Sequence, residues 1–125
     1  MRILELHIRG QVRGGKNNMG VTRQGFHYPK PEFIKWRNDV MGQLGAQIPQ
    51  QFKPVDSIDL KWYFEYTPED RRRRDLPAIL DAVFHCFERA HIVEDDCLIK
   101  NVEFVNYAPD KVNAGLLIQV SDKEN

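Results

Sequence analysis

A strict alternation of apolar and polar side chains sets the first limit on how this chain can fold. Every second residue from Ile58 to Tyr66 is apolar, and a period of two predicts a strand with one buried face. Residues 1–9 show the same alternation, and we predict two further strands over residues 98–107 and 116–120. The chain therefore builds its core on a sheet.

Two other segments repeat their apolar residues at helical spacing. The first starts near Pro31 and runs past Leu44, and the second follows Asp75, from Leu76 to about Arg89. A length of 125 residues with 42% hydrophobic composition suffices for one core and not for two ordinary domains. We expect a single α/β domain over residues 1–125, a two-layer fold with two main helices on a mixed sheet of about four or five strands.

Residues 70–77 carry the strongest functional signal, an arginine run between two aspartates. Its four members are Arg71, Arg72, Arg73 and Arg74. In an extended segment they alternate, so at least two are free to reach solvent or a phosphate group. A solvated loop held by its neighbouring acids is the simpler explanation of the same residues.

An acidic pair, Asp95-Asp96, follows the second helix and suggests a hard metal ion, which prefers oxygen ligands. That helix rises roughly 20 Å, and residues 90–96, if extended, cover about the same distance in return. The spacing permits Asp95 or Asp96 to lie beside Asp75 in a shared metal site. Asp75 also has a purely structural explanation as a helix N-cap.

A glycine-rich basic loop is predicted over residues 10–29. Glycines allow close approach of the backbone to a ligand, and Lys, Arg and Asn donate to phosphate oxygens. The candidate DNA contacts in it are Lys16, Asn17, Asn18 and Arg23. The aromatic residues 26–28 either stack on an unpaired base or anchor the helix that follows.

The formal net charge is zero, but the charge is unevenly distributed. Residues 1–53 hold 9 Lys and Arg against 3 Asp and Glu, whereas residues 54–125 hold 9 against 15. A front half of charge +6 and a back half of −6 suit a protein that binds phosphates with one part and a cation with another. A chance distribution on a solvated surface is the alternative.

These features resemble the RusA-like Holliday junction resolvases of bacteria and their phages. The similarity covers the run from Asp70 to Asp75, the helix after it, the spacing to Asp95-Asp96 and, more weakly, residues 15–18 and 30–40. The resemblance implies a metal-dependent endodeoxyribonuclease that acts in recombination and repair by paired nicks. It also implies a homodimer, Mg²⁺ or Mn²⁺ as cofactor, and branched DNA as partner.

The resemblance assigns catalytic and metal-binding roles to Asp75, Asp96 and Asp95, and phosphate contacts to the arginine run. The chain departs from the family pattern where Pro77 replaces an acidic residue and Asp81 replaces a lysine. Asp81 is either a solvated helix carboxylate or a substitute for the missing ligand. The departures leave room for a junction-binding protein without nuclease activity, or for an interaction domain with no nucleic-acid role.

The remaining sequence features indicate an ordinary intracellular protein. Cys86 and Cys97 lack metal-ligand spacing to a histidine pair, so we expect buried, reduced thiols. The N-terminus has no continuous apolar run, which excludes a signal peptide or membrane anchor there. We therefore expect a cytoplasmic location.

Overall fold

A computed structural model describes residues 2–14 and 19–122. Its main sheet has the strand order β1-β6-β4-β5. The four strands are β1 (Arg2–Arg9), β4 (Leu60–Thr67), β5 (Asn101–Asn106) and β6 (Gly115–Asp122). Strand β5 pairs with β4 in parallel, whereas β6 pairs antiparallel with both β1 and β4. The expected mixed α/β fold is confirmed.

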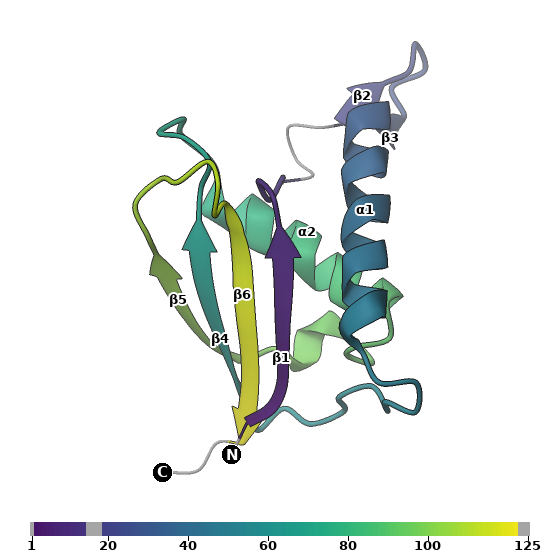
Figure 1. The fold of residues 1–125 in the computed structure, drawn as a ribbon. Helices are drawn as coiled ribbons and strands as arrows, with labels where there is room; N and C mark the ends of the chain where they lie inside the picture. Colours follow the sequence, from purple (N-terminus) through teal and green to yellow (C-terminus); the bar gives the residue numbers. More distant parts are fainter. Residues whose placement is uncertain (1, 15–18, 123–125) are drawn as a thin grey trace.

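The helices α1 (Pro31–Gln47) and α2 (Leu76–Arg89) cover one face of this sheet (Figure 1). The alternation in β4 turns its large side chains toward them, as the burial pattern along the strand shows. The rings of Trp62 and Phe64 stack on Phe87 of α2 with centroid distances of 5.7 and 6.4 Å. Burial of these rings between the sheet and α2 stabilises the core.

Helix α1 also closes the free edge of the sheet at β1. The Gln47 side chain accepts a hydrogen bond from the His7 backbone N–H and donates to the His7 carbonyl, both at 2.7 Å. Gln43 makes the equivalent pair with Arg9, at 2.7 and 3.2 Å. These two side chains satisfy backbone groups that an edge strand otherwise leaves open to another chain.

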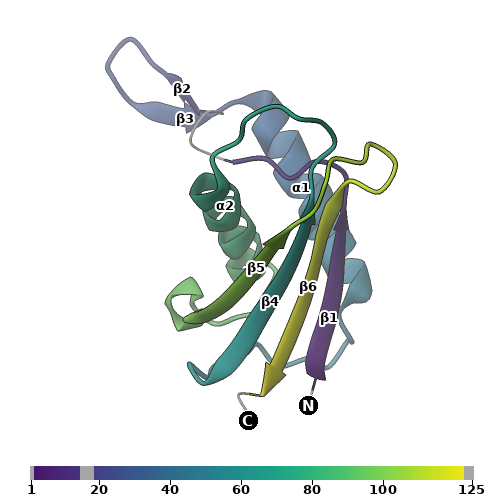
Figure 2. The same cartoon turned by 90° about the vertical axis from the view of Figure 1, so that its left-hand side faces the viewer.

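Three loops lie together on the side of the sheet where the strands β1, β4 and β5 end. Because β6 runs against β1 and β4, and β5 runs with β4, the strands β1, β4 and β5 all end on the same side. The loops that follow them, residues 10–14, 68–75 and 107–114, lie together there (Figure 2). We call this side the basic edge, because the arginine run lies on it.

A second, two-stranded sheet stands apart from the main one. It consists of β2 (Met19–Val21) and β3 (His27–Pro29), and it lies beside the start of α1 (Figure 1). The sequence predicted a loop over this whole stretch. The hairpin forms because Gly25 adopts a φ of +87° in the turn, which glycine does without strain, and Thr22 and Phe26 bond across the turn.

Candidate nucleic-acid interface

Arg74 is the structural member of the arginine run. Its guanidinium lies 2.8 Å from the Asp70 carboxylate and 3.8 Å from that of Glu69, and it donates to the carbonyls of Asp70 and Arg72. Only 16% of the side chain is exposed. Arg74 therefore fixes the shape of the loop and is not available to a ligand.

The other three arginines face solvent. The Arg72 side chain is 81% exposed and lies 3.8 Å from Asp70, and within the described ranges no ion pair engages Arg71 or Arg73. The Asp70 carboxylate accepts the Arg72 backbone N–H, and this bond, followed by Arg74, holds the pKa of Asp70 below its usual value. One fixed carboxylate thus orders a loop that carries three available guanidinium groups.

The chain that leaves β1 joins the arginine loop through Gln11. The Gln11 side chain donates to the Tyr66 hydroxyl at 2.7 Å and accepts the Glu69 backbone N–H at 2.8 Å. Gly14 then passes so close to α2 that an added Cβ would lie 3.0 Å from the Cβ of Ala78. These contacts place Arg13 at the mouth of the same hollow as the arginine run.

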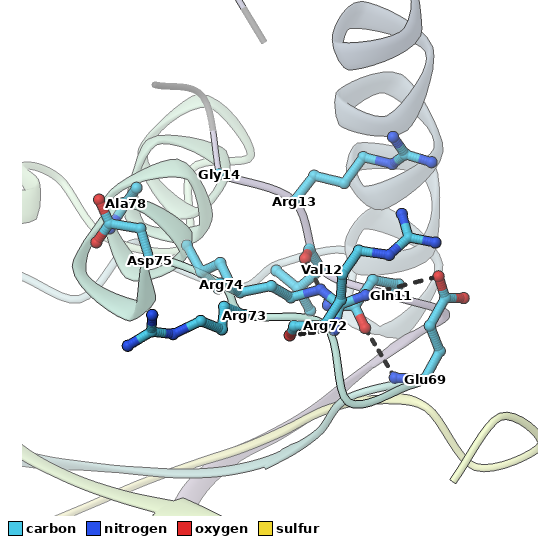
Figure 3. Close-up of a pocket in the computed structure, with 11 residues that line it drawn as sticks. Gln11, Val12, Arg13, Gly14, Glu69, Arg72, Arg73, Arg74, Asp75 and Ala78 are labelled. Carbon is cyan, nitrogen blue, oxygen red and sulfur yellow. Dashed lines mark hydrogen bonds and ion pairs between the residues drawn. The ribbon is translucent and has the colours of Figure 1, made fainter. Parts of the chain in front are cut away.

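Figure 3 shows this hollow at the start of α2. Its charged lining consists of Arg13, Glu69, Arg72, Arg73, Arg74 and Asp75. Arg13 and Arg72 extend in the same direction, whereas Arg73 extends the opposite way (Figure 3). Since Glu69 is engaged by Arg74, the hollow offers an excess of positive charge to an anion.

Asp75 occupies the N-cap of α2, as its position before Leu76-Pro77 predicted. Its carboxylate accepts the Ala78 backbone N–H at 3.4 Å. The side chain is exposed and satisfies one of the helix-end donors that would otherwise lack a partner. The cap explains why an aspartate follows the arginines.

Asp95 and Asp96 lie at the other end of α2. They begin the 3-10 helix η2 (Asp96–Leu98), where the Asp95 side chain accepts the Cys97 backbone N–H at 2.9 Å. That hydrogen bond lowers the pKa of Asp95. Asp96 shares a group of possible metal ligands with His85 and Glu88, whose ligand atoms all lie within 4.8 Å of one another.

The structure does not bring Asp75 and Asp96 together within this chain. His85 follows Asp75 by ten residues, a helical rise of about 15 Å, and Asp96 lies beside His85. Residues 90–96 do not lead back toward Asp75 as expected. Because β5 is parallel to β4, it begins on the side of the sheet where β4 begins, away from Asp75. Figure 2 shows the loop before α2 and the turn after it at opposite ends of the helix.

The other predicted site residues lie in different places. Asp81 projects from α2 into solvent and lies 3.8 Å from His85, four residues along the helix, which agrees with a solvated helix carboxylate. Arg23 is exposed in the turn between β2 and β3. The remaining predicted contacts, Lys16, Asn17 and Asn18, lie outside the described residues.

Three features of the site were not predicted from the sequence. They are the role of Arg74 as an internal anchor, the connection of Gln11 to the arginine loop, and the grouping of His85 and Glu88 with Asp96. Only the last had a detectable signal, because residues three apart share a helix face. The first two depend on contacts between segments distant in sequence.

The cysteines are both free thiols, but only one is buried. Burial raises the pKa of Cys86 to about 11, so it behaves as an inert core residue. Cys97 is exposed, which corrects the expectation that it is buried. It lies in η2, and its hydrogen bond to the Asp95 carboxylate raises its pKa.

The comparisons with known proteins leave the resemblance to resolvases without further support. No model of a known protein family matches this chain, and a search of the curated proteins finds no relative. Among the residues that the structure describes, no helix has the length and apolar content needed to cross a membrane.

Proposed function

We propose that this protein binds branched DNA through its basic edge. The observation that carries the proposal is that Arg13, Arg72 and Arg73 line one hollow at the start of α2. Guanidinium groups bind phosphate oxygens in a forked geometry, and phosphate contacts supply most of the affinity of sequence-independent DNA binding.

The directions of the arginines favour a partner with more than one phosphate backbone. Arg13 and Arg72 extend one way and Arg73 extends the other (Figure 3), so a single loop presents cations toward two separate paths of the phosphate backbone. A duplex and a branch point both place two backbones within one protein footprint, whereas a single strand offers only one. The resemblance of residues 70–96 to resolvases is what favours branched DNA among these partners.

Metal-dependent resolution of Holliday junctions is the second candidate function. Asp75 and Asp96 lie too far apart in one chain to share an ion, so no step is assigned to that pair. The group of His85, Glu88 and Asp96 supports the candidate instead. One imidazole and two carboxylates suit Mn²⁺ or Zn²⁺ better than Mg²⁺, which prefers oxygen ligands. A bound ion of this kind activates water for hydrolysis.

A homodimer is part of this second candidate. Paired nicks need two active sites, and a four-way junction has approximate two-fold symmetry, which a two-fold dimer matches. Light scattering of the protein alone and in complex with a junction measures the stoichiometry directly.

The test measures binding and cleavage separately. A labelled four-way junction and a linear duplex are titrated with protein in chelator, and we expect salt-sensitive binding that favours the junction. Arg72→Gln and Arg73→Gln are expected to weaken it. Lys61→Gln is the matched control, because it removes the same charge at the opposite edge, where Lys61 pairs with Glu103 at 3.0 Å.

The outcomes distinguish a nuclease, a DNA-binding protein without nuclease activity, and an interaction domain. Equal binding by Arg73→Gln and the wild type contradicts DNA binding through the basic edge. Absence of DNA binding altogether favours an interaction domain. Symmetric nicks with Mn²⁺ or Mg²⁺ that vanish in Glu88→Gln support a nuclease. Tight junction binding without nicks under any metal supports the binding protein alone.

A further inference from the structure

The hairpin formed by β2 and β3 exposes two large aromatic side chains. Phe26 is 70% exposed and Tyr28 is 45% exposed. An aromatic residue that anchors a helix start is buried against the body of the protein, and neither ring is. The structure therefore removes the structural explanation that the sequence left open for these residues.

The position of the hairpin keeps both rings accessible. The hairpin projects beyond the main sheet at the end of α1 that lies toward the basic edge (Figures 1 and 2). Tyr28 pairs across the hairpin with Gly20, a residue without a side chain to cover the ring. Two large exposed rings on one short hairpin form an apolar surface of the kind that a ligand covers.

The charge around the rings selects the kind of ligand. Between Gly10 and Pro31 the sequence holds four Lys or Arg residues and no Asp or Glu. Arg23 lies in the hairpin turn and is exposed, and Arg13 lines the neighbouring hollow. Exposed aromatic faces set among cations are the arrangement that binds single-stranded nucleic acid, in which bases stack on rings and phosphates pair with cations.

The hairpin is also braced from within. The Thr22 backbone N–H donates to the Phe26 carbonyl at 2.8 Å, and the Phe26 backbone N–H donates to the Thr22 hydroxyl at 3.0 Å. These bonds fix the backbone that carries Phe26 before any ligand arrives. A braced ring loses less conformational freedom on binding than a ring on an unstructured loop.

We propose that Phe26 and Tyr28 form a stacking site for unpaired nucleobases, so that the hairpin recognises the opened base pairs of a branch point. This inference rests on the proposed DNA binding and deepens it. The basic edge holds the phosphate backbones, and the hairpin distinguishes branched from fully paired DNA. A second copy of the chain and an apolar protein surface are the competing occupants.

The test compares the wild type with Phe26→Ala/Tyr28→Ala on three DNAs: a four-way junction, an oligothymidine strand and a perfect duplex. Loss of one stacked base predicts roughly 5- to 150-fold weaker binding of the variant to oligothymidine and to the junction, and loss of two predicts a larger decrease, with duplex binding unchanged. Phe26→Trp keeps an aromatic ring, so we expect it to bind oligothymidine and the junction as tightly as the wild type does. Ile58→Ala is the matched control, because Ile58 is 48% exposed just before β4, on the side of the sheet opposite the basic edge.

A second readout observes the stacking itself. A 2-aminopurine base placed at the branch point loses fluorescence when it stacks on an aromatic ring, and we expect this quenching with the wild type and not with the double variant. Equal affinities and equal quenching overturn the inference while leaving the DNA-binding proposal intact. A change in oligomeric state in place of DNA affinity, measured by light scattering, overturns it in favour of a second copy. Absence of any DNA binding by the wild type overturns both proposals.

Discussion

Neutralising Arg73 should flatten the salt dependence of DNA binding without weakening the fold. The basic edge has four guanidinium groups available to phosphate, those of Arg13, Arg71, Arg72 and Arg73. At about 0.9 per neutralised phosphate on duplex DNA, four contacts give a slope of log K against log salt of about −3.6. Arg73→Gln should reduce the slope to about −2.7.

This difference in slope is large enough to measure. Between 50 and 200 mM salt, the wild type should lose about 150-fold in affinity and Arg73→Gln only about 40-fold. Fluorescence anisotropy on a labelled duplex at four salt concentrations resolves the two lines. Lys61→Gln should keep the wild-type slope, because Lys61 lies at the opposite edge. A wild-type slope in Arg73→Gln, or an equal loss of slope in Lys61→Gln, refutes the assignment of the phosphate contacts.

Four further outcomes separate structural from functional roles. Arg74→Gln should lower the melting temperature, since its guanidinium anchors the loop at 2.8 Å from Asp70, whereas Arg73→Gln should not. Asp75→Ala should cost about 0.5–1 kcal/mol in unfolding free energy through the lost cap, and Asp75→Asn close to nothing. The lowered pKa of Asp70 predicts stability that is present at neutral pH and lost as pH falls through its folded-state pKa, with a smaller loss in Asp70→Asn in acid unfolding curves. Glu88→Gln should abolish Mn²⁺ or Zn²⁺ binding in calorimetry, and Asp95→Asn should preserve it.

The fold was predictable because its periodic signals agree with one another. The alternation that ends at Tyr66 and the helical spacing after Asp75 are long and regular, and the structure bears out both elements. The hairpin of β2 and β3 was missed because its strands have three residues each, too few for a period to be visible.

The candidate site was only partly predictable, since its decisive contacts are not local. The arginine run was evident in the sequence. The anchoring of Arg74 and the hydrogen bond from Gln11 to Tyr66 depend on where the loops that follow β1 and β4 lie relative to each other. The expected approach of Asp96 to Asp75 assumed that the chain returns along α2. A parallel pairing of β4 and β5 reverses that geometry, and strand direction cannot be read from alternation alone.

The arginine run and the possible metal ligands His85, Glu88 and Asp96 lie at opposite ends of α2, so their functions are separable. The distance of about 15 Å along the helix exceeds the Debye length of about 8 Å at physiological ionic strength. A metal ion bound by His85, Glu88 and Asp96 therefore barely affects the electrostatic potential at the arginines. Removal of a ligand such as Glu88 should therefore leave the salt slope of DNA binding unchanged, and Arg73→Gln should leave ion affinity unchanged. The two substitutions should add without coupling in a double-mutant cycle. A measured coupling would contradict this separation, because the strand directions keep the two ends of α2 apart within a single chain.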